Sequence, residues 1–174
     1  EHADFLSSFL REPRSVGALA PSSRFLARRV VSSCPLPSAS MVIELGPGTG
    51  AFTRLIRERL TPTTTFIALE LNVDHVRALR RKFPGLLVYH DSAERMADYL
   101  ALHGKKQADC VISGLPWALL SNEQQTRLLT TIHESLAPGG GFVAFAYAHA
   151  RWMARARDFR GGLQARFSRV EISP

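Results

Sequence analysis

Residues 41–50 read Met-Val-Ile-Glu-Leu-Gly-Pro-Gly-Thr-Gly, a short apolar run that leads into a glycine-rich turn. The apolar residues that follow recur at helical spacing, at Phe52, Leu55, Ile56 and Leu60. Glycine allows the backbone to turn tightly and to approach a ligand without a clashing Cβ atom. A strand, a glycine-rich turn and a helix in this order are typical of nucleotide-binding α/β domains.

The same alternation continues outward from this turn. Asn72 is expected to cap one helix, and Ser121 with Gln124 forms a capping box for another that runs to Leu136. Pro138–Gly141 is expected to end that helix. Alternating strands and helices predict a Rossmann-like α/β fold with a mostly parallel sheet and helices on both faces. The expected strands are 41–45, 66–71, 86–90, 108–113, 142–148 and a short one at 169–173.

The bulk composition limits the possible classes of protein. The 174 residues suit one domain, and 22 Lys and Arg against 15 Asp and Glu give a net charge of +7. This excess indicates an anionic partner, either nucleic acid or an acidic membrane surface, or else an ordinary solvated basic surface. Cys34 and Cys110 lack the spacing of a zinc or redox site and are too few for a disulfide framework. We therefore expect a buried, reduced Cys110, a cytoplasmic protein and no metal site.

The glycine turn alone does not identify the cofactor, because Gly46-x-Gly48-x-x-Ala51 also fits the dinucleotide pattern. Glu44 favours S-adenosylmethionine, whose ammonium a carboxylate attracts, over an anionic pyrophosphate. Glu70, at the end of the second strand, suits the ribose of either cofactor. Asp91 with Ser92 follows the third strand, where methyltransferases hold the adenine amino group. The predicted cofactor contacts are Glu44, Gly46, Pro47, Gly48, Thr49, Gly50, Thr53, Glu70, Leu71, Asn72, Asp91, Ser92, Ala93, Ser113 and Gly114.

The fourth strand runs into Ser113-Gly114-Leu115-Pro116-Trp117. This turn resembles the Asn/Asp-Pro-Pro-Tyr or Asn-Leu-Pro-Tyr motif of methyltransferases that act on nitrogen. Gly114 stands where those families have Asn or Asp, which weakens the grip on a planar base and favours a flexible amine. An alkylammonium, with a pKa of about 10.4, must lose a proton before it can accept a methyl group. Trp117 and Tyr147 are the candidate aromatic wall for the cationic product, and His149 is the candidate proton relay.

The N-terminal segment from Phe9 to Arg24 carries Val-Gly-Ala-Leu-Ala-Pro-Ser-Ser at 16–23. Together with the Glu44–Gly50 loop and the Ser113–Pro116 turn, it resembles bacterial phospholipid N-methyltransferases over nearly the whole chain. The resemblance implies methylation of an amino lipid such as phosphatidylethanolamine or an ornithine lipid, with S-adenosylhomocysteine as the second product. The lipid contacts expected from it are Pro21, Ser22, Leu115, Pro116 and Trp117.

The resemblance also implies that residues 1–37 form a helical lid that touches the membrane, and that residues 38–174 form the catalytic core. Apolar residues with interleaved arginines suit an interfacial helix. The expected location is the inner face of the cell membrane, with the protein peripheral and monomeric. Rossmann-like methyltransferases add a seventh strand, which is expected to be missing because the chain stops at Pro174. The predicted membrane contacts are Phe5, Phe9, Arg11, Arg14, Arg24, Arg28 and Arg29.

Two alternatives within the methyltransferase class stay open. The N-terminal region is also distantly similar to ribosomal RNA adenine dimethylases, and the basic excess suits phosphate contacts. Gly114 argues against that alternative. A small-molecule methyltransferase is the other, while an NAD-dependent oxidoreductase or a non-enzymatic cofactor-binding module has the least support.

Overall fold

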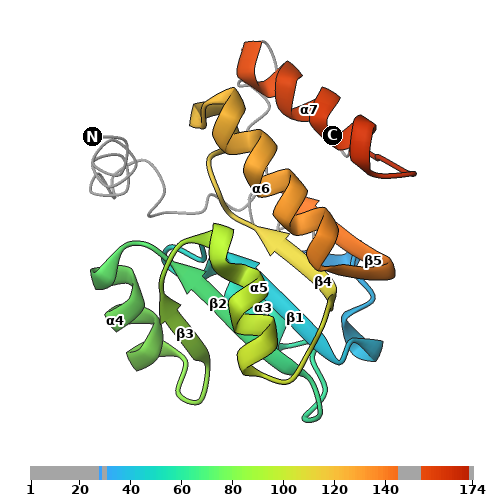
Figure 1. Cartoon of the computed structure of the whole chain (residues 1–174). Coiled ribbons are helices and arrows are strands. Elements are labelled where there is room, and N and C mark those ends of the chain that lie inside the picture. Colours follow the sequence, from blue (N-terminus) through green and yellow to red (C-terminus); the bar gives the residue numbers. More distant parts are fainter. Residues whose placement is uncertain (1–27, 29–30, 145–153, 173–174) are drawn as a thin grey trace.

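The computed structural model describes residues 28, 31–144 and 154–172 (Figure 1). In these residues the sheet has five strands in the order β3-β2-β1-β4-β5, and every neighbouring pair is parallel. The predicted α/β class is therefore confirmed. The strands are β1 (Met41–Leu45), β2 (Thr65–Glu70), β3 (Leu87–His90), β4 (Ala108–Ser113) and β5 (Leu136–Ala144).

Helices cover both faces of the sheet, and the central strands β1 and β4 are therefore buried on both sides. One face packs against α5 (Met96–Leu102) and α6 (Asn122–Ser135), which lie in front of the sheet in Figure 1. The other face packs against α3 (Ala51–Arg57), α4 (Val73–Lys82) and residues 31–39. A further helix, α7 (Ala154–Arg166), packs against α6 on the side away from the sheet. Short 3-10 turns lie at Leu36–Ser38 (η1), Ala93–Arg95 (η2) and Trp117–Leu119 (η3).

Both predicted helix caps form. The side-chain oxygen of Asn72 accepts hydrogen bonds from the backbone N–H groups of Asp74 and His75 at the start of α4. Ser121 and Gln124 form the reciprocal capping box of α6. These local signals fix where the two helices begin, and α4 thereby starts at Val73, three residues after β2 ends at Glu70.

The predicted end of α6 at Leu136 was one residue too late, but the prediction that Pro138–Gly141 lies before the fifth strand was wrong. The helix stops at Ser135, and β5 begins at once with Leu136, so the strand includes Pro138–Gly141. Glycine is needed there because a Cβ atom on Gly140 would lie 2.8 Å from the carbonyl oxygen of Ala137. The strand expected at 169–173 is also wrong for residues 169–172, which form neither strand nor helix. Residues 145–148 of the expected fifth strand lie outside the described residues.

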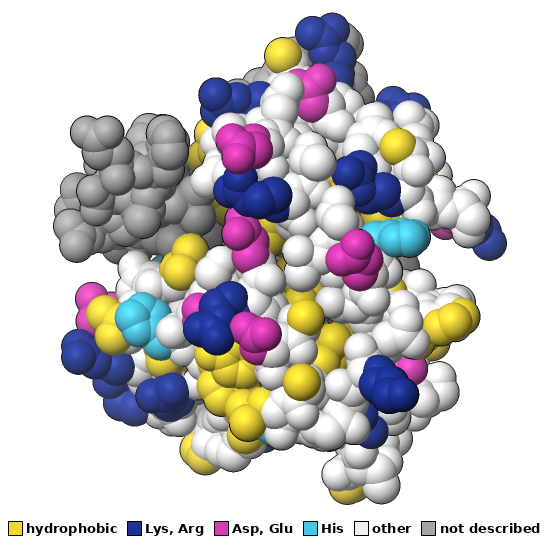
Figure 2. Space-filling model, viewed as in Figure 1, with side chains coloured by type: hydrophobic (Ala, Val, Ile, Leu, Met, Phe, Trp, Pro, Cys, Tyr) yellow, Lys and Arg dark blue, Asp and Glu magenta, His cyan; other side chains and the backbone are white. Residues whose placement is uncertain are grey.

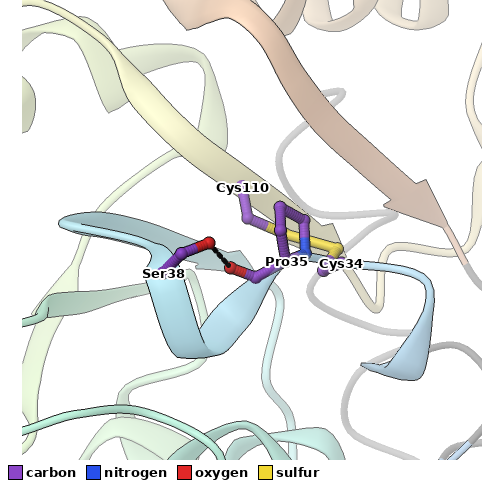
Figure 3. The surroundings of a disulfide bond; sticks show 4 residues. All are labelled: Cys34, Pro35, Ser38 and Cys110. Atoms are coloured by element: carbon purple, nitrogen blue, oxygen red, sulfur yellow. Dashed lines mark hydrogen bonds between the residues drawn. A yellow bond between two sulfur atoms is a disulfide. The ribbon is translucent and has the colours of Figure 1, made fainter.

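Cys34 and Cys110 form a disulfide, contrary to the expectation from their number and spacing (Figure 3). They are 76 residues apart, but Cys110 of β4 faces residues 31–39, which bring Cys34 to a Cα–Cα distance of 6.4 Å. Cys110 is fully buried, as predicted. Ser38 donates a hydrogen bond to the carbonyl of Pro35 and closes the turn between Cys34 and β1. Sequence spacing gives no sign of this pair because only the tertiary fold brings the two residues together.

Candidate cofactor and acceptor site

A cavity of about 110 Å³ opens at the carboxyl ends of β1, β2, β3 and β4. The strand order reverses between β1 and β4, and open α/β sheets bind ligands at such a switch point. The cavity therefore lies where the sequence predicts the cofactor. Its lining residues are Gly46, Leu69, Glu70, Leu71, Asp91, Ser92, Ala93, Glu94, Gly114, Leu115, Pro116, Leu120, Gln124 and Leu128.

Glycines bring two loops of this site into close contact. Gly50 has a φ of +81°, and a Cβ atom there would lie 2.5 Å from the ring of Phe83 at the C-terminal end of α4. Gly114 lies directly against the loop after β1, where a Cβ atom would come within 2.6 Å of the carbonyl oxygen of Gly46. A side chain at Gly114 would push the two loops at the cavity apart, and one at Gly50 would clash with Phe83, which explains why glycine occupies both positions.

Glu44 is buried on the α3 face of the sheet and does not line the cavity. Thr53 of α3 donates a 2.7 Å hydrogen bond to its Oε2, whereas Oε1 has no hydrogen-bond partner among the described residues. Burial, opposed by the Thr53 hydrogen bond and reinforced by the charge of Glu70, raises the pKa of Glu44 to about 8. The predicted contact between Glu44 and the cofactor ammonium stays a prediction. The unpartnered Oε1 is the atom that would accept a hydrogen bond from that group.

Glu70 ends β2, lines the cavity and is 2% exposed. Its Oε2 accepts a 2.9 Å hydrogen bond from the backbone N–H of Gly48, and its Oε1 accepts one of 2.9 Å from Asn72. This carboxylate therefore ties the glycine-rich loop to the start of α4. These two hydrogen bonds leave lone pairs on the carboxylate free to accept from further donors, such as the hydroxyls of a ribose.

Asp91 lies just after β3 on the other side of the cavity from Gly114. Tyr99 of α5 donates a 2.8 Å hydrogen bond to its Oδ2, and Arg95 lies 3.1 Å from the same oxygen. Partial burial would raise the pKa of Asp91, but the Tyr99 and Ser92 hydrogen bonds and the charge of Arg95 outweigh it and lower the pKa. The carboxylate is thus kept ionised and oriented. Sequence reasoning missed Tyr99 and Arg95, which η2 and the first turn of α5 bring back toward Asp91.

Ser113 and Trp117 fasten the turn after β4 instead of lining the cavity. Ser113 is buried, and its Oγ accepts hydrogen bonds from the indole Nε1 of Trp117 (3.0 Å) and the backbone N–H of Leu115 (3.3 Å). The Trp117 ring is 2% exposed and stacks on Phe159 of α7 at a centroid distance of 4.3 Å. This placement contradicts the expectation that Trp117 forms an aromatic wall for the acceptor, because the ring points into the core.

The structure places the predicted site residues in four groups. Seven of the predicted cofactor residues line the cavity, as do Leu115 and Pro116 from the predicted lipid contacts. Thr53 is buried as the partner of Glu44, and Asn72 caps α4, so both support the site from behind. Of the predicted membrane residues, Arg28 is described and is exposed. The predicted residues outside the described part of the chain are Phe5, Phe9, Arg11, Arg14, Pro21, Ser22, Arg24, Arg29, Tyr147 and His149.

Further cavity-lining residues were not predicted, namely Leu69, Glu94, Leu120, Gln124 and Leu128. Gln124 drew notice only as a helix cap, and the others have the apolar or polar types expected at any surface or core. Among the described residues, no group of three or more His, Cys, Asp or Glu side chains is placed to hold a metal ion. No helix in the described ranges has the length and apolar character needed to cross a bilayer.

Residues 42–140 match the family model described as a methyltransferase domain. The chain is 36% identical over 141 residues to an ornithine lipid N-methyltransferase of Singulisphaera acidiphila, which covers 79% of this chain and 73% of that protein. It is also 36% identical over 83 residues to ribosomal RNA small subunit methyltransferase A of Burkholderia thailandensis. That match covers 46% of this chain and only 30% of the relative.

Solved structures share the fold at low sequence identity. A TehB-like S-adenosylmethionine-dependent methyltransferase of Corynebacterium glutamicum superposes with a TM-score of 0.61 at 14% identity, covering 94% of this chain and 82% of the other. An amino pentose methyltransferase of Micromonospora echinaspora with bound S-adenosylmethionine gives 0.53 at 18% identity, covering 76% of this chain. This chain spans 53% of the length of that enzyme.

Proposed function

Because the chain belongs to the class I S-adenosylmethionine-dependent methyltransferases, we propose that it transfers the methyl group to the amine of an amino lipid. The candidate acceptors are phosphatidylethanolamine and an ornithine lipid. The observation that carries the proposal is the 36% identity, over 73% of its length, to an ornithine lipid N-methyltransferase. The match to the ribosomal RNA enzyme is confined to less than half of this chain.

The surroundings of Gly114 support a flexible amine over a planar base. In the related nitrogen methyltransferases, an Asn or Asp side chain at this position grips the base. Here a Cβ atom would lie 2.6 Å from the backbone oxygen of Gly46, so no side chain fits without a backbone shift. The acceptor nitrogen must therefore be held by other groups, and an alkylamine makes fewer demands on planar hydrogen bonding than adenine does.

The chemistry divides between the cofactor and the protein. S-adenosylmethionine supplies an electrophilic methyl group on its sulfonium. A neutral amine attacks that carbon in line, the C–N bond forms as the C–S bond breaks, and the new methylammonium loses a proton. We propose that Glu70 holds the ribose, that Asp91 with Ser92 holds the adenine, and that Leu115 and Pro116 contact the acceptor. Tyr147 and His149 stay our candidates for the aromatic contact and the proton relay.

We also propose that the protein works on a membrane surface, with the predicted membrane residues between Phe5 and Arg29 as the contact, since Val31, Cys34 and Leu36 are buried against the sheet. On the face shown in Figure 2, Lys and Arg side chains alternate with Asp and Glu, without one large basic patch. The cationic contact therefore has to lie elsewhere, and the arginines near Arg28, which is exposed, are the candidates. A location at the inner face of the cell membrane would keep cysteines reduced, so the state of the Cys34–Cys110 pair in cells bears directly on that location.

One assay distinguishes the acceptor classes. The protein is incubated with S-adenosylmethionine carrying a labelled methyl group and, in separate reactions, with anionic liposomes containing phosphatidylethanolamine, the same liposomes containing an ornithine lipid, or ribosomal RNA. We expect label in the lipid fraction and S-adenosylhomocysteine in equal molar amount. Label in RNA and in neither lipid would refute the proposal in favour of the RNA methyltransferase alternative.

A further inference from the structure

His75 has a buried nitrogen beside the carboxylate that we assign to the ribose. The residue lies in the first turn of α4, and its side chain is 21% exposed. Its Nδ1 atom is buried and has no hydrogen-bond partner among the described residues. The nearest carboxylate oxygen is Oε2 of Glu70, 3.9 Å away. An unpaired buried polar atom is costly. The absence of a hydrogen bond between Nδ1 and so near a carboxylate therefore needs an explanation.

The distance is too long for a hydrogen bond because Glu70 is engaged elsewhere. Its Oε2 accepts the N–H of Gly48 at 2.9 Å, which draws this oxygen toward the glycine-rich loop. A displacement of about 1 Å toward α4 would bring Oε2 within hydrogen-bond distance of Nδ1. The backbone N–H of His75 donates to the Asn72 side chain at 3.2 Å and fixes the main chain at the start of α4, so a rotation of either side chain is enough to close the gap.

Binding of a ribose would supply the reason for such a movement. A carboxylate has about four lone-pair positions, and Gly48 and Asn72 occupy two of them in this structure. Two ribose hydroxyls would take the two remaining positions, and we expect their binding to turn the carboxylate and loosen the 2.9 Å hydrogen bond from Gly48 to Oε2. A carboxylate that releases Gly48 inside a buried site needs another donor to hold its orientation.

We propose that His75 is a positioning residue for the cofactor and that its Nδ1–H takes the place of the Gly48 N–H on Glu70 when the ribose binds. The inference rests on the cofactor assignment and on the proposed role of Glu70 at the ribose, and it does not depend on which acceptor is methylated. Glu70 touches the ribose, whereas His75 acts only through Glu70. This arrangement links α4 to the affinity for the cofactor without any contact between His75 and the ligand.

Three variants of the full chain test the proposal, with binding of S-adenosylhomocysteine measured by calorimetry. His75→Asn keeps an N–H donor at about the position of Nδ1, His75→Gln moves the donor toward Nε2, and His75→Leu removes it. We expect His75→Leu to weaken binding about tenfold, in line with the loss of one hydrogen bond to a charged group. His75→Asn should bind within about twofold of the wild type, and His75→Gln should resemble His75→Leu.

A modified ligand separates positioning from general damage to the fold. The same titrations use an analogue of S-adenosylhomocysteine whose ribose lacks the 2′ and 3′ hydroxyls. With this ligand the difference between the wild type and His75→Leu should fall below about twofold, because Glu70 has no ribose to orient. An equal loss with both ligands, or a His75→Asn variant as weak as His75→Leu, would overturn the proposal. The lipid assay reports separately on the acceptor, since none of these titrations contains an acceptor.

Discussion

At the scale of single residues, Glu44 shows how the fold changes the chemistry of a side chain. The carboxyl group is 1% exposed and has one hydrogen bond, from Thr53, so burial raises its pKa to about 8. At neutral pH the protonated form therefore predominates in the protein without cofactor. An approaching ammonium group would favour the ionised form. We therefore expect Glu44 to lose its proton when the methionine end of the cofactor binds.

The raised pKa of Glu44 predicts a dependence of stability on pH. A carboxyl whose pKa is higher in the folded state than the unfolded value of 4.5 stabilises the fold fully below that value. This contribution is lost progressively as the pH rises to about 8. Glu44→Gln, which mimics the protonated form, does not lose it. Relative to the wild type, we expect the variant to gain about 2 kcal/mol of unfolding free energy between pH 6 and pH 9 in urea titrations. A constant difference across this range would contradict the raised pKa.

Gly114 allows a matched test of backbone contact in the site. Gly114→Ala places a methyl group 2.6 Å from the carbonyl oxygen of Gly46, so the two loops must separate. We expect a loss of about 1–3 kcal/mol in unfolding free energy and weaker binding of S-adenosylhomocysteine. Gly161→Ala in α7, where the added Cβ atom meets no neighbour, is the control and should be neutral or slightly stabilising. Equal behaviour of the two variants in calorimetry would show that close approach at Gly114 is unimportant.

At the scale of elements, the turn after β4 is held by groups from three parts of the chain. Ser113 accepts from the Trp117 indole, and Gln125 of α6 donates to the carbonyls of Trp117 (2.7 Å) and Arg155 (3.0 Å). The Trp117 ring stacks on Phe159 of α7. The turn that lines the cavity with Leu115 and Pro116 is therefore kept rigid by α6 and α7, and Trp117 is its anchor.

Removing the hydroxyl of Ser113 tests this anchor. In Ser113→Ala the Trp117 indole N–H loses its acceptor while it stays buried, so we expect a loss of about 1–3 kcal/mol in unfolding free energy. The KM for the acceptor should rise, because Leu115 and Pro116 lose their support. Thr64→Ala removes a 2.8 Å hydrogen bond to the Ala39 carbonyl at the opposite end of β2 from the cavity, at a cost of about 1 kcal/mol, and serves as the control that should leave KM unchanged. An equal rise in KM in both variants would show that the effect comes from general destabilisation and not from the loss of support for Leu115 and Pro116.

At the scale of the whole molecule, the Cys34–Cys110 disulfide joins residues 31–39 to the second strand from the edge of the sheet. Because it closes a loop of 76 residues, its reduction should cost about 2–4 kcal/mol of unfolding free energy. We expect dithiothreitol to lower the urea midpoint of the wild type and to leave that of Cys34→Ser unchanged. If reduction has no effect on the wild type, the two cysteines do not form a bridge in solution. Alkylation of the protein in intact cells, followed by mass spectrometry, then reports its state at the site of function.

The membrane proposal also belongs to the whole molecule. Reversal of Arg24, Arg28 and Arg29 to Glu should abolish flotation with anionic liposomes, since each arginine near such a surface contributes about 1 kcal/mol. A control variant reverses three other exposed cations, Arg54, Arg77 and Arg81, and has the same net charge. We expect the control to float like the wild type. If both variants lose binding equally, overall charge and not the N-terminal segment attracts the protein to the membrane.

The sequence by itself determined the order of the elements and the place of the cofactor loop. Strand periodicity, the Asn72 cap and the Ser121–Gln124 box are local signals, so the central elements lie where they were predicted. Only the tertiary structure decided which side chains face the cavity and which support it. The Trp117 ring is buried in the core and Cys34 is bonded to Cys110 because packing brings together residues that are far apart in sequence. The Glu44–Gly50 loop marked the site, and contacts across the sheet assigned Glu44 to the interior and Glu70 to the cavity.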